Sequence, residues 1–436
     1  MKKWASDNQN LNAFFEERQI SVMIKFLIPF FIVLFGNQSL VNAQTNSDID
    51  KSCPPKTVFE LFKKKDSILV VKPIKNSFLL VIPIIGVQPA TGLSYGATAQ
   101  YTFKGKEVSD KYSSANLGVT FTTQKQLLIN AKNNILLKNN RVYLRGDYRL
   151  YVFTQPNYGL GTNIVPTNRE DPDFDIESIK EPMDYNYFKF HQTASWEIKK
   201  DFYIGGGIEI DWYSTIVDKN LDVENGKFTN HYNYSILNGF NENEYFVNGL
   251  SFNFIYDSRD NQINTRKGWF ANVDFRFNAD LFNDQEASNV LFTEFRYFVP
   301  MDPKREQFVL GFWAFGQFVT KGVVPYLNLP AIGWDQRSRS GEGYTQGLFR
   351  GNNLAYLQVE LRFPITCNQL LSGTVFTNFT TASNKFERIG LFEYVQPAFG
   401  FGLRLLIDKA TRTNLVFDYA VGNHSNGFYL NAGETF

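Results

Sequence analysis

Residues 355–363 alternate between the two faces of a strand without a break, and this alternation limits what the chain can fold into. The side chains of a β-strand point alternately to its two faces, so the segment predicts a strand with one apolar face and one charged face. If many such strands close into a barrel, the apolar faces meet lipid and the charged faces meet a wet lumen. The apolar face consists of Ala355, Leu357, Val359, Leu361 and Phe363, and the other face of Tyr356, Gln358, Glu360 and Arg362.

Segments with the same period of two continue from about residue 76 to residue 436. They predict an all-β fold, a transmembrane antiparallel barrel of 16 strands, because bacterial barrels with both ends in the periplasm have an even number of strands. A soluble β-sandwich or propeller is the alternative. The predicted strands are 77–87, 93–104, 114–123, 126–138, 141–153, 186–199, 202–215, 245–257, 268–280, 288–300, 306–320, 353–365, 369–382, 394–407, 412–421 and 427–436.

The predicted connections are short on one side of the barrel and long on the other. The three long connections are residues 154–185, 216–244 and 321–352, and all of them fall on the same side. Short periplasmic turns and longer outer loops are the expected asymmetry of such barrels. The order of the strands makes 321–352 the sixth outer loop, and we expect this loop to fold into the lumen.

The composition is compatible with a membrane barrel and argues against a nucleic-acid partner. The 43 Phe and 22 Tyr residues favour strands. The mean hydropathy of −0.26 resembles that of a soluble protein, but a barrel gives the same value because half of every strand faces water. A net charge of +1 lacks the basic excess that is typical of nucleic-acid binding.

Residues 1–43 are interpreted as an N-terminal extension and a signal peptide, with Met23 as a possible true start. A basic residue and an apolar run lie within 23–35, and a small-residue cleavage site precedes Gln44. A membrane anchor is the alternative, but the apolar run is shorter than the roughly 20 residues that a helical span needs. Residues 44–75 are predicted to be a periplasmic tail, and 76–436 the barrel.

Neither the cysteines nor the histidines form a recognisable reactive site. Cys53 and Cys367 both fall on the predicted periplasmic side, where they either pair or remain free thiols. His191, His231 and His424 are scattered without metal-ligand spacing. The chain has no Gly-x-Ser-x-Gly elbow. We therefore predict no catalytic, cofactor or metal site, and a protein that is not an enzyme.

Four segments of the chain carry motifs that point to a family. They are Tyr256–Asn261 with Asn264–Trp269, Arg339–Gly351 with Glu360–Pro364, Val375–Asn378, and Phe428–Phe436. Together they resemble signatures of the BamA/TamA superfamily of outer-membrane barrel proteins, also known as bacterial surface antigens. In chain order, they are similar to that family's periplasmic turn, its sixth loop with the strand that follows, a short hydrophobic strand motif and a terminal aromatic assembly signal. The resemblance covers about residues 76–436.

The resemblance implies roles for residues of these segments. In the family an arginine of the sixth loop is latched onto the inner wall. The implied latch residues are Arg339, Gly341, Glu342, Gly343, Tyr344 and Arg350, and the implied luminal partners are Glu360, Arg362 and Asn378. The implied turn residues are Asp257, Arg259 and Asp260, and the implied assembly signal is Phe428, Leu430, Gly433 and Phe436. Local hydrogen bonds within a tight turn and a plain luminal ion-pair ladder are simpler alternatives for the charged residues.

The chain departs from the family pattern at the latch. The family loop typically reads Arg-Gly-Tyr/Phe, whereas residues 342–344 read Glu-Gly-Tyr, and Asn378 replaces the acid of the thirteenth strand. We therefore expect a rewired latch from Arg339 or Arg350 to Glu360, or else a loop that no longer does the family's work. The segment before the barrel is too short for the family's POTRA domains, which we expect to be missing.

We predict a non-enzymatic component of a Gram-negative outer membrane that inserts, moves or docks proteins or lipids at the seam between the first and last strands. Gly96 and Gly433 reduce packing near the seam, and Pro83 and Pro89 remove hydrogen-bond donors in or beside the first strand. A weakly closed edge can pair with an incoming strand. A passive channel, a structural barrel without a client, or an anchor for a partner protein are the alternatives. The predicted partners are outer-membrane lipid and the barrel-assembly machinery that inserts the chain itself.

Overall fold

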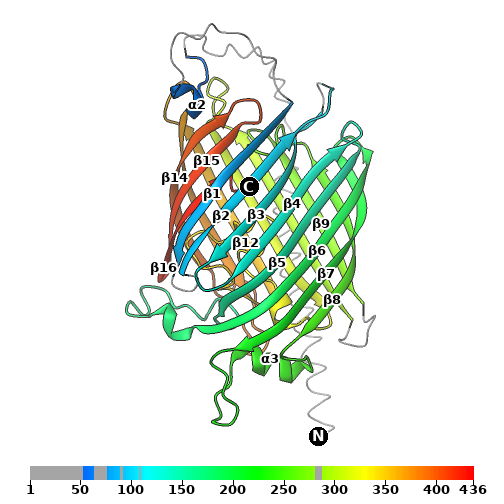
Figure 1. Ribbon diagram of the computed structural model, residues 1–436, viewed down its shortest axis with the longest axis vertical. Helices are drawn as coiled ribbons and strands as arrows, with labels where there is room; N and C mark the ends of the chain where they lie inside the picture. The colour runs from blue at the N-terminus through cyan, green and yellow to red at the C-terminus, as the bar shows by residue number, and fades with distance from the viewer. Residues whose placement is uncertain (1–52, 63–75, 89–91, 108–109, 280–286) are drawn as a thin grey trace. The chain divides into compact units, whose positions relative to one another are not determined.

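The computed structural model describes residues 53–62, 76–88, 92–107, 110–279 and 287–436. Within these ranges sixteen strands form one antiparallel sheet, in which each strand pairs with its neighbours in the sequence (Figure 1). The predicted fold is therefore confirmed. The strands are β1 (Ser77–Gln88), β2 (Gly92–Phe103), β3 (Ser113–Thr122), β4 (Leu127–Leu137), β5 (Val142–Asn157), β6 (Glu181–Lys199), β7 (Phe202–Asp218), β8 (Tyr245–Asp257), β9 (Gly268–Asn278), β10 (Ser288–Pro300), β11 (Val309–Lys321), β12 (Asn353–Pro364), β13 (Leu371–Ala382), β14 (Gln396–Asp408), β15 (Thr413–Gly422) and β16 (Ser425–Ala432).

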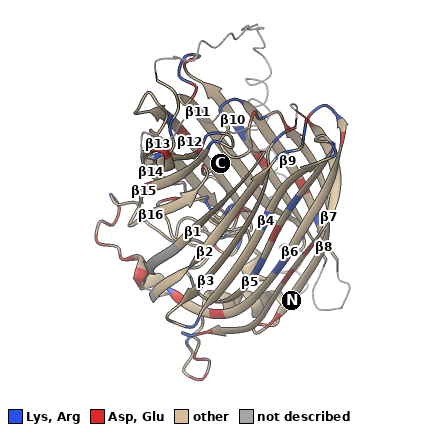
Figure 2. Ribbon diagram, turned by 45° about the horizontal axis from the view of Figure 1, so that its top comes forward, with Lys and Arg blue, Asp and Glu red and all other residues tan. Residues whose placement is uncertain are grey.

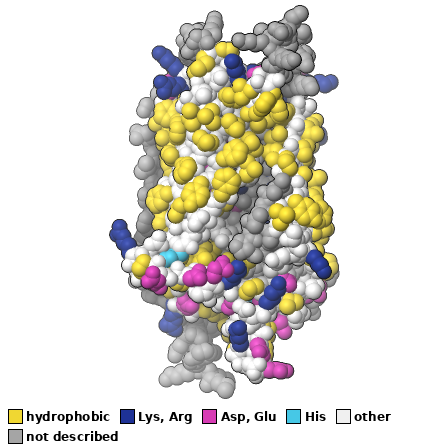
Figure 3. Space-filling model, turned by 60° about the vertical axis from the view of Figure 1, so that its left-hand side comes forward, with side chains coloured by type: hydrophobic (Ala, Val, Ile, Leu, Met, Phe, Trp, Pro, Cys, Tyr) yellow, Lys and Arg dark blue, Asp and Glu magenta, His cyan; other side chains and the backbone are white. Residues whose placement is uncertain are grey.

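Alternation along the strands separates a lipid-facing surface from the lumen. In β8, Leu250 and Phe252 are exposed, whereas Ser251 and Asn253 between them are buried. On the face shown in Figure 3, hydrophobic side chains cover the middle of the barrel, and charged side chains gather at its two ends. Charged residues also occur within the strands (Figure 2). Because a charge turned to lipid at mid-depth costs about 2–4 kcal/mol, the strand charges point inward.

The long connections share one end of the barrel, as predicted. They are residues 158–180, 219–244 and 322–352, and the last of these is called loop six below. Helix α3 (Asn230–Asn238) begins after the N-cap Thr229, whose hydroxyl accepts a hydrogen bond from the Tyr232 amide. It ends at Gly239, where a positive φ of 74° suits glycine. Short turns such as 200–201 and 409–412 occupy the opposite end. The 3₁₀ helices η1 (Ile176–Ile179) and η2 (Tyr326–Asn328) lie within the long connections.

A disulfide ties the segment before the barrel to the short-turn end. Cys53 bonds to Cys367 in the turn between β12 and β13, with Cα atoms 5.9 Å apart. The Lys56 amide donates to the Asn368 carbonyl at 2.8 Å. Helix α2 (Val58–Leu61) follows. In the part of the chain that the structure describes, no helix is long and apolar enough to cross a bilayer. The predicted signal peptide lies outside the described residues.

Candidate functional site

The two edge strands of the sheet, β1 and β16, border a seam. β1 pairs only with β2 and β16 only with β15, and no ladder joins the described residues of β1 to those of β16. The two strands nevertheless lie side by side in Figure 1. A hollow of about 760 Å³ lies between them, lined by Leu80, Ile82, Phe428 and Leu430 of the edge strands and by residues of loop six. The seam therefore presents two strand edges beside a cavity.

β16 is short because the chain leaves the sheet at Gly433. The predicted strand 427–436 is wrong at its end: β16 stops at Ala432, Gly433 adopts a φ of 75°, and residues 434–436 turn into the lumen. Thr435 and Phe436 are 0% and 1% exposed. The predicted assembly signal is thus divided, because Phe428 and Leu430 face outward on β16 whereas Phe436 is buried. The period-two pattern favours a continued strand, but contacts in the lumen stabilise the turn inward instead. We call residues 433–436 the terminal segment.

Loop six holds the terminal segment through arginine. The Arg339 guanidinium donates to the carbonyls of Ala432 at 2.9 Å, Gly433 at 2.8 Å and Glu434 at 2.7 Å. Arg337 adds longer contacts to the carbonyl of Glu434 at 3.4 Å and to another carbonyl in the turn between β8 and β9. Arginine suits this task because its planar fork presents several donors at once. Arg339 is therefore a latch, but its partner is main chain.

The expected contact of the latch with Glu360 is wrong for both candidate arginines. Among the described residues, Glu360 pairs with Arg362 and lies 4.0 Å from Arg404. Arg350 instead donates to carbonyls of its own loop, including that of Tyr326 at 3.0 Å. Sequence spacing showed which residues face the lumen but not which of them meet.

The glycine-rich part of loop six docks against the wall through hydrogen bonds that involve main chain. The Asn378 amide donates to the Glu342 carbonyl at 2.8 Å, and the Gly343 amide donates to the Tyr429 hydroxyl at 2.8 Å. Gly341 and Gly343 both have positive φ values, 80° and 102°. Tyr344 donates to the Pro397 carbonyl at 2.5 Å. Burial and the nearby carboxylates raise the pKa of Glu342 well above its usual value.

The periplasmic-turn residues make one local ion pair, as in the simpler alternative, and one contact with a distant turn. Arg259 donates twice to Asp257, at 2.9 and 2.7 Å. Asp260 accepts from the main-chain amide of Arg266 at 3.0 Å and pairs with Arg412 at 2.5 Å. Asp260 therefore links this turn to the turn between β14 and β15.

Sequence reasoning named Arg362 and Phe436 but missed four other residues that hold or bury the terminal segment, Glu434, Arg404, Asn414 and Trp313. Glu434 pairs with Arg404 at 2.9 Å and accepts from the Asn414 amide at 2.7 Å. The Phe436 ring lies 5.5 Å from the Trp313 ring, and its carbonyl accepts from Arg362 at 3.2 Å. Arg404 was visible as an inward-facing charge in an alternating strand. Its partners lie on other strands, so no local signal could have identified them.

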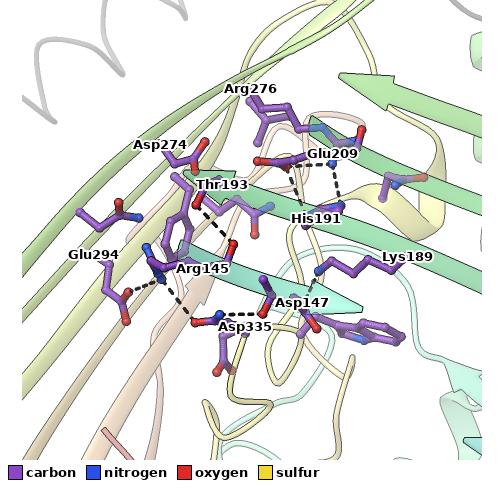
Figure 4. A pocket seen from close by; sticks show the side chains of 18 of the residues that line it. Arg145, Asp147, Lys189, His191, Thr193, Glu209, Asp274, Arg276, Glu294 and Asp335 are labelled. Carbon is purple, nitrogen blue, oxygen red and sulfur yellow. Dashed lines mark hydrogen bonds and ion pairs between the residues drawn. The ribbon is translucent and has the colours of Figure 1, made fainter. Parts of the chain in front are cut away.

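A second charged cluster lines a luminal cavity of about 180 Å³ (Figure 4). Arg276 and His191 both lie against Asp211, at 2.7 and 2.9 Å, and Lys189 pairs with Asp147 at 2.9 Å. These groups come from the adjacent strands β5, β6 and β7 and from β9. No group of three or more His, Cys, Asp or Glu residues in the described ranges could hold a metal ion. The cluster therefore consists of paired charges that line a polar lumen.

Comparisons with known proteins match the barrel. The family model described as "Omp85 superfamily domain" matches residues 88–436. BamA of Haemophilus ducreyi lacking POTRA domains 1–3 is similar in fold, with a TM-score of 0.50, 15% identity, and coverage of 82% of this chain and 69% of that one. CdiB of Acinetobacter baumannii has a TM-score of 0.48 and 13% identity, and the match covers 81% of this chain and 59% of CdiB. No curated protein gives a significant sequence match.

Proposed function

Because the chain belongs to the Omp85 superfamily, we propose that it inserts, moves or docks other proteins or lipids at the seam between β1 and β16. The family and the sixteen-stranded barrel place the chain in the outer membrane of a Gram-negative bacterium, in contact with its lipid. The role is non-enzymatic, and barrel-assembly machinery inserts the chain itself.

The unpaired seam is the observation that carries this proposal. An exposed strand edge offers unpaired amides and carbonyls, which can template the pairing of another strand. Here two such edges stand beside a hollow of about 760 Å³ that reaches residues of loop six. A client strand could thus meet a backbone template and a polar cavity together.

The filled lumen weighs against the alternative of a passive channel. Loop six buries residues such as Leu348 and Phe349 inside the barrel, each 0% exposed. The terminal segment occupies further space on the luminal side of β16. A wide pore would require both segments to leave, so conductance with loop six in place should be small.

A bridged seam tests the proposal. Ile82→Cys and Leu430→Cys line the same hollow, and a flexible bismaleimide can join them in the purified full-length chain. As a matched control, Leu250→Cys and Phe277→Cys face each other on β8 and β9, where the strands are already paired. Each protein is reconstituted in phospholipid vesicles with a urea-denatured eight-stranded barrel protein, whose folding is followed by heat-dependent gel mobility.

We expect the unbridged chain to accelerate folding of the added protein and the seam bridge to remove at least nine-tenths of that acceleration. The control bridge should leave the acceleration unchanged. Equal acceleration with and without the seam bridge would contradict a working seam. A large conductance that persists with the seam bridged would favour the passive channel.

A further inference from the structure

We propose that residues 434–436 occupy a peptide-binding site inside the barrel and can be exchanged for another segment of the same chemistry, an acidic residue followed two positions later by an aromatic one. The site is built from the turn between β8 and β9 and from strands β10, β11, β12, β14 and β15. The inference stands apart from the seam function, because binding alone tests it.

The aromatic half of the site is a slot for one ring. The Phe436 ring lies 5.7 Å from the Phe298 ring and 5.5 Å from the Trp313 ring. The Arg362 guanidinium lies 5.6 Å from its centroid, within the range of a cation–π contact. Gly311 completes the slot, since a Cβ there would lie 3.2 Å from the ring. The wall is therefore shaped around an aromatic side chain.

The acidic half of the site binds one carboxylate. Glu434 lies 2.9 Å from Arg404, accepts from Asn414 at 2.7 Å, and accepts a longer bond from Asn264 at 3.4 Å. Although burial acts to raise its pKa, Arg404 and Arg362 lower it to about 2. The carboxylate is thus held ionised by cations and amides that belong to the wall.

One further side-chain contact is a long hydrogen bond of 3.4 Å, which the Thr435 hydroxyl donates to the Glu342 carboxylate. The Arg339 guanidinium donates to main-chain carbonyls of residues 432–434, which any segment can offer. In other peptide-binding sites, hydrogen bonds to the main chain provide affinity and pockets for side chains provide selectivity. Here the carboxylate site and the aromatic slot would provide the selectivity.

The site also has a route by which one segment could replace another. The terminal segment joins β16 through Gly433, whose positive φ of 75° makes a sharp turn. The hollow at the seam is lined by Gly433, Glu434 and Arg339, so it reaches the docked segment directly. A competing peptide could enter from the seam while the walls of the site stay in place.

A single cysteine reports whether the terminal segment is docked. Cys53 and Cys367 are joined in a disulfide, so Thr435→Cys in the otherwise unchanged chain provides the one free thiol under non-reducing conditions. The Thr435 side chain is fully buried, whereas Lys304→Cys on an exposed turn gives the reference rate. Maleimide labelling is measured on the chain refolded in detergent micelles, with circular dichroism as the check on folding.

The competitor is the synthetic peptide Asn-Ala-Gly-Glu-Thr-Phe, which repeats residues 431–436. Two control peptides carry Gln in place of Glu or Ala in place of Phe. We expect Thr435→Cys to be labelled at least 100-fold more slowly than Lys304→Cys. The competitor at millimolar concentration should accelerate labelling at least fivefold, and each control peptide should have little effect.

Two further variants separate the site from general loosening of the lumen. Arg362→Gln in the Thr435→Cys chain should accelerate labelling without any peptide, since it removes contacts to Phe436. Arg276→Gln removes a luminal arginine of the other cluster and should not change the rate. Labelling as fast as that of Lys304→Cys would show that the segment is not docked. Slow labelling that the competitor does not accelerate would show that the terminal segment cannot be exchanged, and would overturn the proposal.

Discussion

The wall formed by β5, β6 and β7 and the seam between β1 and β16 are stabilised in different ways. The wall strands have 16, 19 and 17 residues, and β5 is paired with β6 along its whole length. The edge strands have 12 and 8 residues. In the wall, hydrogen-bonded ladders and luminal ion pairs act together. At the seam the terminal segment leaves the sheet, and side-chain contacts in the lumen replace the ladder. The seam is therefore the least stable part of the barrel wall, because the chain there gives up backbone pairing and docks its last residues in the lumen.

The largest expected effect concerns the wall. Asp211 is buried, and Asp211→Ala would leave the partly exposed side chains of Arg276 and His191 without their shared carboxylate. Removing one partner of a buried ion pair costs about 3–5 kcal/mol, and we expect about 3 kcal/mol because Glu209 still lies near both groups. Urea unfolding in micelles measures the change, with the exposed Asp173→Ala as control. A loss of less than about 1 kcal/mol would mean that the ladder alone stabilises the wall.

The next prediction concerns the terminal segment. Glu434→Gln removes the charge that faces Arg404 and should cost about 2 kcal/mol at pH 7, the value of a hydrogen bond to a charged group. The docked pKa of about 2 lies below the ordinary 4.5, so the carboxylate stabilises the docked state above pH 4.5. This contribution is lost as the pH falls from 4.5 towards 2.

Urea unfolding of the two proteins across this range checks the prediction. The difference in free energy of unfolding between wild type and Glu434→Gln should decrease steadily as the pH falls below 4.5. A difference in free energy of unfolding that stays constant down to pH 3 would argue that Glu434 stabilises the protein through its shape and not through its charge.

A smaller effect separates the two arginines of loop six. Lysine offers a compact charge and cannot span the three carbonyls that Arg339 binds. We expect Arg339→Lys to accelerate maleimide labelling of Thr435→Cys about tenfold, which corresponds to about 1.4 kcal/mol. Arg350→Lys is the matched control, because Arg350 binds carbonyls of its own loop. Equal acceleration by both variants would point to general loosening of loop six.

The smallest effect on the barrel is expected from the disulfide. Reduction of Cys53–Cys367 should free the segment around Cys53 and Lys56 from the turn between β12 and β13. Neither the wall nor the seam should change, because strand pairing involves neither cysteine. Trypsin should then cleave after Lys56, whose main chain is otherwise held at Asn368. Mass spectrometry identifies the cut, and Cys367→Ser gives the same product without reductant. A change in urea unfolding above about 1 kcal/mol would show that the tether supports the barrel itself.

The alternation of single strands was sufficient to predict the barrel. Leu250 and Phe252 face outward, with Ser251 between them facing the lumen, as their spacing indicates. The predicted ends of most strands lie within a few residues of the observed ones. Such predictions succeed because lipid and water act on each side chain independently, so a period of two records the environment locally.

The sequence by itself determined the number of strands, their faces and the placement of loop six. Only the tertiary structure decided that Arg339 binds the carbonyls of residues 432–434, that Glu434 meets Arg404, and that β16 ends early. Each of these facts depends on groups from distant strands whose separation is set by the register around the barrel. The chain turns into the lumen only if the luminal contacts stabilise it by more than the strand pairing that it gives up. That total depends on many distant residues, so it cannot be predicted from a short stretch of sequence.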